Sequence, residues 1–266
     1  VADDAEAQPA QAANRNRVKS FQISRMGFGS PLYTISRMFV AALKVDVVAE
    51  DAIESLKNGE KPIILVENTM QELLEELAEM DDLEDAVAVD FRALFHRTLR
   101  KMVTTTTKVR GGAPIKGDLT ANDPVLAAKV ESIRRMIDAL PDLHVSVIDE
   151  VKRRIEEAGY TVDEITGRSL EVRNGRIMRR PANNPTVIKN DFNDGVIDAL
   201  VINVSGSTGI DLHASSTFPD QRRRVMMELQ SPADILRKLQ AHGRVNRYDQ
   251  VVDPRVKSYV SGLPIE

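Results

Sequence analysis

The chain contains three short and almost uninterrupted apolar runs, at residues 62–66, 199–204 and 224–229. A strand with one solvent-facing side shows an alternating pattern, whereas a strand buried on both faces shows a continuous one. Helical patterns lie between these runs, and a further strand is expected at 256–260. Strands that alternate with helices predict an α/β fold with a central, mainly parallel sheet. Ligands of such sheets bind at the carboxyl ends of the strands.

Local patterns predict the remaining elements. Apolar residues three and four apart indicate helices that include residues 35–47, 73–80, 91–99, 124–140, 148–158 and 233–240. Asn174-Gly175 predicts the tight turn of a β-hairpin. The threonines at 104–107 predict an extended segment or a loop, and residues 109–124 predict a loop.

Composition excludes several classes of protein. The chain has no cysteine, so it holds no disulfide or thiolate metal site, which fits a reducing compartment. No apolar run approaches the roughly 20 residues that a membrane helix needs, and the first residues lack the apolar core of a signal peptide. We therefore expect a cytoplasmic protein without a membrane partner. Because the chain begins at Val1, we also expect a fragment or a processed product.

Two arginines near the C-terminus belong to a motif with helical spacing. Gln240, Gly243, Arg244 and Arg247 follow one another at intervals of three, one and three residues. On a helix over residues 240–250 their side chains would share one face. Two guanidinium groups one turn apart suit a polyanion such as a triphosphate, where an arginine neutralises the charge that develops in phosphoryl transfer. The alternative is a solvated basic helix face.

A second motif follows the apolar run at 199–204. Gly206 and Gly209 lie in a Ser/Thr/Gly loop, where glycines allow backbone amides to turn towards an anion. Asp211 can accept a hydrogen bond from a sugar hydroxyl. Taken alone, such a loop is usually a plain turn. Its occurrence before an apolar strand and the arginine motif favours a functional site.

The order of these two motifs is that of the last two motifs of superfamily 2 helicases. Residues 190–250 resemble the C-terminal helicase lobe of Strawberry notch-type proteins, and the resemblance extends through Asp163–Arg168 and more faintly through 31–69. It implies a RecA-like α/β lobe that binds nucleotide together with a preceding RecA-like lobe. The implied organisation is a disordered tail or linker over 1–20, the start of the lobe over 21–69, a helical insertion over 70–160, and the remainder of the lobe over 161–266.

The resemblance also implies roles for individual residues. Arg247 matches the arginine-finger position, with Arg244 as its companion. The implied nucleotide-binding residues are Gly209, Asp211, Gln240 and Gly243. ATP and Mg²⁺ are the implied cofactors, and both would be shared with the preceding lobe.

Nucleic acid is the second expected partner, and we expect DNA. Arg222 and Arg223 are candidates for phosphate contacts, and the loop residues Ser205 and Thr208 are further candidates. Alternatively, the arginines flank the sheet as solvated charge. With four Tyr, seven Phe and no Trp, no base-stacking platform is evident, and the four histidines lack the spacing of metal ligands.

The chain departs from a complete ATPase in one respect. No GxxxxGK[ST] motif occurs, because Gly117 in the segment 111–118 is followed by Asp118. Residues 145–150 superficially resemble a metal-binding strand that ends in Asp-Glu, but Asp149 and Glu150 are better placed in the first turn of a helix. The P-loop must therefore come from a different segment or chain, and this chain should not hydrolyse ATP alone.

Two functions are compatible with these observations. In the first, the chain is the second RecA-like lobe of a superfamily 2 DNA-dependent ATPase, helicase or translocase. In the second, it is a non-catalytic structural or binding module, for example a fragment that is packaged in a virion or forms a complex. Phage relatives in the family include antirestriction proteins packaged with DNA, and the resemblance permits that role and a virion location here.

Overall fold

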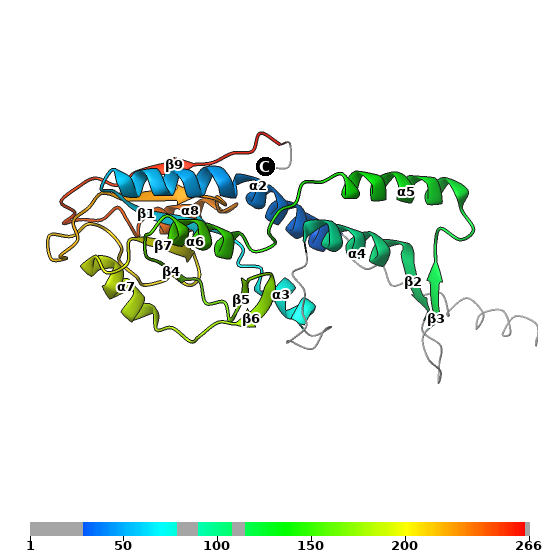
Figure 1. The fold of residues 1–266 in the computed structure, drawn as a ribbon, viewed down its shortest axis with the longest axis horizontal. Helices are drawn as coiled ribbons and strands as arrows, with labels where there is room; N and C mark the ends of the chain where they lie inside the picture. The colour runs from blue at the N-terminus through cyan, green and yellow to red at the C-terminus, as the bar shows by residue number, and fades with distance from the viewer. Residues whose placement is uncertain (1–28, 79–89, 108–114, 264–266) are drawn as a thin grey trace, which may run out of the picture. The chain divides into compact units, whose positions relative to one another are not determined.

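The computed structural model describes residues 29–78, 90–107 and 115–263. The tail predicted over residues 1–20 lies outside this part. The chain divides into two compact units. The first comprises residues 33–94 and 141–266, and we call it the sheet unit. The second includes residues 29–32 and 95–140, and we call its residues 95–140 the helical unit (Figure 1).

Five parallel strands form the centre of the sheet unit, in the order β4-β7-β1-β8-β9. They are β1 (Lys61–Val66), β4 (Val162–Ile165), β7 (Ala199–Asn203), β8 (Arg224–Glu228) and β9 (Arg255–Ser258). The middle three strands are buried along their whole length, as continuous apolar runs require. The predicted α/β fold with a parallel sheet is confirmed.

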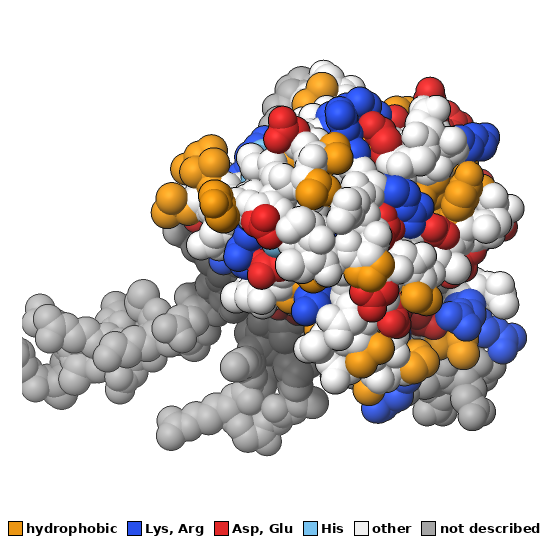
Figure 2. Space-filling view, turned by 90° about the vertical axis from the view of Figure 1, so that its left-hand side faces the viewer, with side chains coloured by type: hydrophobic (Ala, Val, Ile, Leu, Met, Phe, Trp, Pro, Cys, Tyr) orange, Lys and Arg blue, Asp and Glu red, His pale blue; other side chains and the backbone are white. Residues whose placement is uncertain are grey.

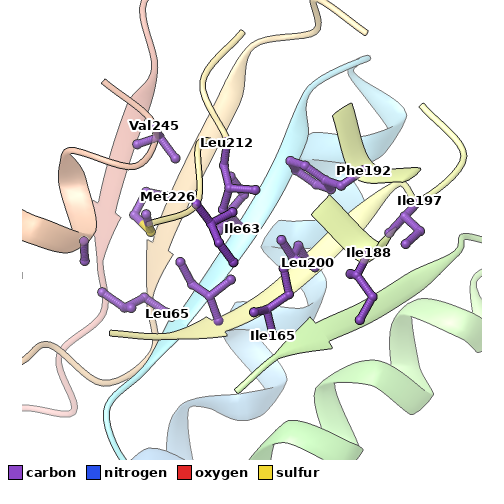
Figure 3. Close-up of a cluster of buried hydrophobic side chains, with 13 residues drawn as sticks. Ile63, Leu65, Ile165, Ile188, Phe192, Ile197, Leu200, Leu212, Met226 and Val245 are labelled. Atoms are coloured by element: carbon purple, nitrogen blue, oxygen red, sulfur yellow. The ribbon is translucent and has the colours of Figure 1, made fainter. Parts of the chain in front are cut away.

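Helices lie on both faces of this sheet (Figures 1 and 3). They are α2 (Gly29–Lys57), α6 (Val147–Glu157), α7 (Pro185–Asp194) and α8 (Ile235–His242), whereas α3 (Gln71–Ala78) packs against the hairpin that follows β4. A hairpin of β5 (Leu170–Arg173) and β6 (Arg176–Arg179) follows β4. Its turn is the predicted Asn174-Gly175, and both residues have a positive φ, as the tight hairpin turn requires.

The core on one face of the sheet joins alternate strand residues to α7 and to the end of α8 (Figure 3). Phe192 of α7 is fully buried in this cluster beside Leu200 of β7 and Ile63 of β1. The cluster also includes Ala241 and Val245, which anchor the segment that carries the arginine motif. Burial of this motif's backbone therefore fixes its place relative to the sheet.

The helical unit contains two packed helices and a two-stranded ribbon. The elements are α4 (Phe91–Val103), whose residues from Phe95 onward belong to this unit, β2 (Thr104–Thr107), β3 (Ile115–Asp118) and α5 (Pro124–Asp138). Leu99 and Val103 of α4 and Val130 and Ile137 of α5 form its core. The loop predicted over residues 109–124 is wrong in part, because Ile115–Asp118 pairs with β2 in an antiparallel ladder.

Two further sequence predictions can be compared with the structure. β4 was not predicted, because its short sequence Val-Asp-Glu-Ile carries two charges. The segment 145–150 enters α6 with Ser146 as the N-cap and with Asp149 and Glu150 in the first turn, so the helical interpretation is confirmed. None of the described helices is both long and apolar enough to cross a bilayer. The insertion predicted over 70–160 stays a prediction, although α6 lies in the sheet unit.

Truncation of Phe192 should destabilise the sheet unit, because its ring fills the space between α7 and the sheet. We expect Phe192→Ala to lower the free energy of unfolding by about 3–5 kcal/mol, measured by denaturant titration. Val187→Ala in the same helix is the control, because Val187 is 52% exposed. An equal loss in both variants would contradict this account of the core.

Candidate functional site

The loop that follows β7 is folded tightly against the carboxyl edge of the sheet. The Asn203 side chain accepts a hydrogen bond from the Gly206 amide at 2.7 Å, and the buried Ser207 hydroxyl donates to the Asn203 carbonyl at 2.6 Å. A Cβ on Gly206 would lie 2.7 Å from the Ile165 carbonyl oxygen at the end of β4. Only glycine permits this close approach, so the loop is built onto two strand ends.

The exposed part of this loop contains three of the predicted site residues. Ser205, Thr208 and Gly209 are exposed, and Gly209 has a φ of +76° with open space beyond it. The Thr208 hydroxyl donates to the Val204 carbonyl at 3.2 Å. The loop thus presents polar groups to solvent at the edge where ligands of parallel sheets bind.

The helix expected over residues 240–250 is shorter in the structure. α8 ends at His242, and Gly243 is its C-cap. Arg244 and Val245 continue in turns, with their amides donating to Ala241 and His242. The prediction of one continuous helix is therefore wrong, because burial of Val245 in the core turns the chain out of the helical path.

Backbone hydrogen bonds join the arginine segment to the chain that follows the glycine loop. The Leu212 amide donates to the Arg244 carbonyl at 2.9 Å, and the Val251 amide donates to the Ala214 carbonyl at 2.8 Å. The Ser216 amide donates to Asp249 in the same way. The two predicted motifs, about thirty residues apart in sequence, are therefore held side by side.

Arg247 and Asp211 meet at this junction. Arg247 Nη1 lies 2.7 Å from Asp211 Oδ1, and Arg247 Nε donates to the Gly243 carbonyl at 2.9 Å. The two side chains are 43% and 42% exposed, so the ion pair is at the surface. The structure thereby brings together a predicted catalytic residue and two predicted nucleotide-binding residues.

Arg244 and Gln240 are placed differently. Arg244 is half-buried, and among the described residues its guanidinium has no hydrogen-bond or ion-pair partner. Gln240 is exposed on the last turn of α8. Both groups are therefore available to a ligand or to another protein surface.

Sequence reasoning missed a buried carboxylate at the carboxyl end of β8. Glu228 is fully buried and accepts from His242 Nε2 at 2.5 Å, from Lys238 Nζ at 2.9 Å and from the Ser258 hydroxyl at 2.6 Å. These contacts fasten α8 and β9 to β8. The signal was present in the sequence, because an acid that ends an apolar strand needs partners.

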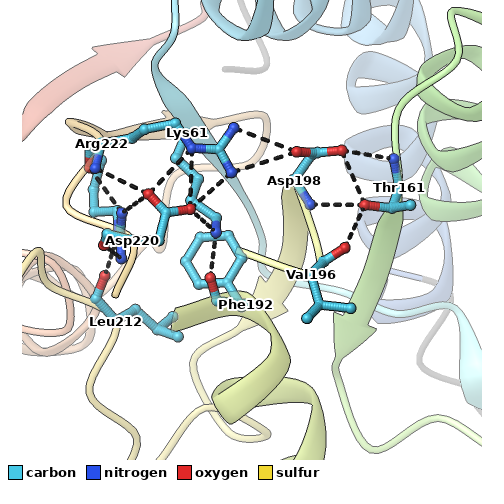
Figure 4. Close-up of polar contacts among 9 residues, drawn as sticks. Lys61, Thr161, Phe192, Val196, Asp198, Leu212, Asp220 and Arg222 are labelled. Atoms are coloured by element: carbon cyan, nitrogen blue, oxygen red, sulfur yellow. Dashed lines mark hydrogen bonds and ion pairs between the residues drawn. The ribbon is translucent and has the colours of Figure 1, made fainter. Parts of the chain in front are cut away.

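A second buried cluster lies at the opposite, amino end of the sheet (Figure 4). Lys61 begins β1, is fully buried, and donates to Asp220 and to the Phe192 carbonyl. Burial lowers the pKa of Lys61 to about 8, although Asp220 opposes this shift. Arg224 is also buried here and donates to the backbone carbonyls of Leu212, Asp220 and Arg222.

Arg222 belongs to this amino-end cluster. It lies 2.7 Å from Asp220 and 3.3 Å from Asp198, and its side chain is 31% exposed (Figure 4). Arg223, by contrast, is exposed. The structure shows no contact of either residue with Ser205 or Thr208, and their nucleic-acid role stays a prediction.

A third network holds α6 and the β5–β6 hairpin against β4. Arg168, which is fully buried, lies 2.5 Å from Glu164 and also pairs with Asp149. Asp149 Oδ2 accepts from the Val172 amide of the hairpin at 2.6 Å. A cavity of about 230 Å³ lies between these elements, and none of the predicted site residues lines it.

The comparisons with known proteins agree with this geometry. Residues 146–266 match the family model described as the C-terminal domain on Strawberry notch homologue. This part of the chain is therefore similar to the C-terminal domain of Strawberry notch-type helicases. Both motifs, the strands β4, β7, β8 and β9, and the helices α7 and α8 lie within it.

Curated relatives match a longer part of the chain. Protein strawberry notch homolog 1 of Gallus gallus is 32% identical over 161 residues, covering 54% of this chain and 13% of that protein. Protein strawberry notch homolog 2 of Homo sapiens is 30% identical over 154 residues, covering 50% of this chain and 10% of that protein. The chain thus spans only about a tenth of these relatives.

A solved structure, the C-terminal part of the Fun30 ATPase domain, aligns with a TM-score of 0.32 at 12% identity. The alignment covers 82% of this chain and 67% of that one.

The Glu228 network should make stability depend on pH. Burial raises the pKa of Glu228, but hydrogen bonds from Ser258, His242 and Lys238 outweigh it and lower the pKa from 4.5 to about 2. A lowered carboxyl pKa adds stability above pH 4.5, and this contribution is lost as the pH falls from 4.5 towards 2.

We expect Glu228→Gln to remove this part of the acid dependence, at most about 3 kcal/mol, in unfolding titrations between pH 7 and 2. Glu156→Gln, which changes an exposed carboxylate of α6, is the control. A parent-like pH profile in Glu228→Gln would contradict the assignment.

Proposed function

We propose that this chain supplies the second RecA-like lobe of a superfamily 2 DNA-dependent ATPase, helicase or translocase. Its part of the reaction is an arginine finger, Arg247, with Arg244 as companion. The observation that carries the proposal is the exposed ion pair of Arg247 with Asp211, two residues beyond the exposed Gly209 of the loop that leaves the carboxyl end of β7. This is the edge at which α/β folds bind ligands.

The contacts of Arg247 allow its guanidinium group to exchange Asp211 for a phosphate. Its ion pair with Asp211 is solvent-exposed, and such pairs contribute only about 0–1 kcal/mol. A phosphate offers the guanidinium a stronger, bidentate acceptor. The contact to the Gly243 carbonyl keeps the side chain in place while Asp211 is exchanged for the phosphate.

The residues of this chain suit the terminal phosphate of a nucleotide, but they do not include the loop that binds the other phosphates. Arg244 and Arg247 supply positive charge for the terminal phosphate, and Gly209, Asp211, Gln240 and Gly243 line the same edge. The GxxxxGK[ST] loop is absent from the sequence. No group of three acidic, His or Cys side chains suited to a cation occurs within residues 29–78, 90–107 and 115–263. ATP and Mg²⁺ would therefore be held mainly by the P-loop lobe.

The surface of α8 supports a protein partner at this edge. Ile235, Leu236 and Leu239 are 63%, 64% and 58% exposed, directly before Gln240. Apolar side chains gathered at one surface are typical of an interface. A P-loop lobe seated here would cover them and bring its nucleotide to Arg244 and Arg247. The family resemblance also permits an antirestriction role and a cytoplasmic or virion location.

Loss of the guanidinium of Arg247 should abolish most ATP turnover. With the chain joined to its P-loop lobe, we expect Arg247→Ala to lower DNA-stimulated ATPase activity by about 10³-fold, measured as phosphate release, because the developing charge loses its counter-charge. Arg247→Lys should remain strongly impaired, because an ammonium group lacks the bidentate geometry.

Lys57→Ala serves as the control for this experiment, because Lys57 is exposed at the end of α2, away from both motifs. Unchanged turnover in Arg247→Ala would refute the arginine-finger role and favour the non-catalytic module.

Arg222 and Arg223 should respond differently to truncation. Arg222→Ala leaves Asp220 and Asp198 without this partner, so we expect a loss of about 1–3 kcal/mol in the free energy of unfolding. Arg223→Ala should leave stability unchanged and weaken DNA binding in fluorescence anisotropy if Arg223 contacts phosphate. Equal stability loss in both variants would contradict the distinction.

A further inference from the structure

The helical unit carries a charge opposite to that of the rest of the chain. Residues 95–140 contain nine Lys and Arg and four Asp and Glu, a net charge of +5. The whole chain has a net charge of −4, which leaves −9 for the remaining residues. On the face drawn in Figure 2, positive and negative side chains are interspersed. Segregated positive charge of this kind attracts polyanions.

The pairing of α4 with α5 places two arginines on the same side of the helical unit. His96 Nε2 lies 2.7 Å from Asp138 Oδ1, which fixes the level and the side at which the two helices meet. Arg100 follows His96 by one turn, and Arg134 precedes Asp138 by one turn. The two helices run antiparallel, so one turn forward along α4 and one turn back along α5 lead in the same direction. Arg100 and Arg134 therefore lie at the same level, on the side of the helical unit that carries the His96–Asp138 contact.

Little inside the helical unit neutralises these two groups. Arg100 is exposed, and α4 contains no acidic residue. Arg134 is exposed and lies 3.5 Å from Glu131, at the limit of a weak surface pair. Its charge also reaches the exposed Asp118, whose pKa is lowered by hydrogen bonds from Thr120 and, more weakly, by Arg134. Two like charges facing solvent at one level repel each other, and an anion between them removes that repulsion. The arrangement favours a phosphate group.

The support beneath the two arginines is rigid. Leu99 and Val103 pack against Val130 and Ile137, and Asp123 caps α5 by accepting from the Val125 and Leu126 amides. Side chains on packed helices lose less freedom when they bind than side chains on loops. The helical unit therefore presents its positive charge on a fixed scaffold.

The composition of the helical unit specifies the part of a nucleic acid that it contacts. Phe95 is its only Phe, Tyr or Trp, and this ring packs against the core. Base stacking requires exposed aromatic rings, whereas phosphate contacts require only positive charge. Binding should therefore be independent of base sequence.

We infer that the helical unit is a nucleic-acid-binding element whose Arg100 and Arg134 hold the phosphate backbone without reading its bases. Its residues belong to a different unit from the two motifs and from Arg222 and Arg223. The inference assigns a function to part of the chain between β1 and β4, the next strand of the sheet in sequence. The inference does not depend on nucleotide binding or on the proposed arginine finger.

The experiment compares the full chain with the double variant Arg100→Gln/Arg134→Gln. Affinity for a labelled 20-base-pair DNA duplex and for the matching single strand is measured by fluorescence anisotropy without nucleotide, between 50 and 200 mM salt. We expect binding to weaken about 10- to 100-fold at about 100 mM salt. The slope of log affinity against log salt should fall by about two for the duplex, because two phosphate contacts are lost.

Lys57→Gln/Arg255→Gln removes the same charge from exposed residues of the sheet unit and is the matched control. Circular dichroism and thermal unfolding verify that both variants fold. A parent-like control together with a weakened Arg100/Arg134 variant supports the inference, whether or not Arg247→Ala affects ATPase activity.

Equal weakening in the two variants would reduce the effect to overall charge and overturn the inference. Unchanged affinity and slope in Arg100→Gln/Arg134→Gln would also overturn the inference. The positive surface would then be a binding site for an acidic protein. Discrimination between duplexes of different sequence would refute backbone recognition.

Discussion

The structure depends on the pairing of charged groups at the ends of strands that are buried on both faces. Lys61 begins β1 and is paired with Asp220, whereas Glu228 ends β8 and accepts from four side chains. An isolated buried charge would cost several kcal/mol, so each of these groups requires its partners. The partners come from distant segments, and the pairs thereby fix the layers around the sheet.

This constraint divides the arginines of the C-terminal domain into two groups. Arg168, Arg222 and Arg224 are committed to acceptors within the protein. Arg244 and Arg247 remain accessible, and Arg247 has an exposed ion pair and one hydrogen bond to a backbone carbonyl. Sequence alone gives all five the same chemistry, and burial separates those that build the fold from those that can meet a ligand.

The central strands and the two motifs could be predicted because their signals are local. The apolar runs defined β1, β7 and β8, and the glycine loop followed β7 as expected. β4 could not be predicted, because its Asp163 and Glu164 mask a strand that is stabilised by tertiary ion pairs. The residue at which α8 ends could not be predicted either, because it depends on the burial of Val245 in the core. The pairing of Arg247 with Asp211 requires the three-dimensional fold.

The hydrogen bond between the Leu212 amide and the Arg244 carbonyl has a mechanical consequence. With the contacts from Val251 to Ala214 and from Ser216 to Asp249, it ties the chain that follows the glycine loop to the arginine segment. A displacement imposed on either is transmitted to the other without a hinge. Any force that a bound polymer exerts on the loop would then reach the guanidinium groups directly.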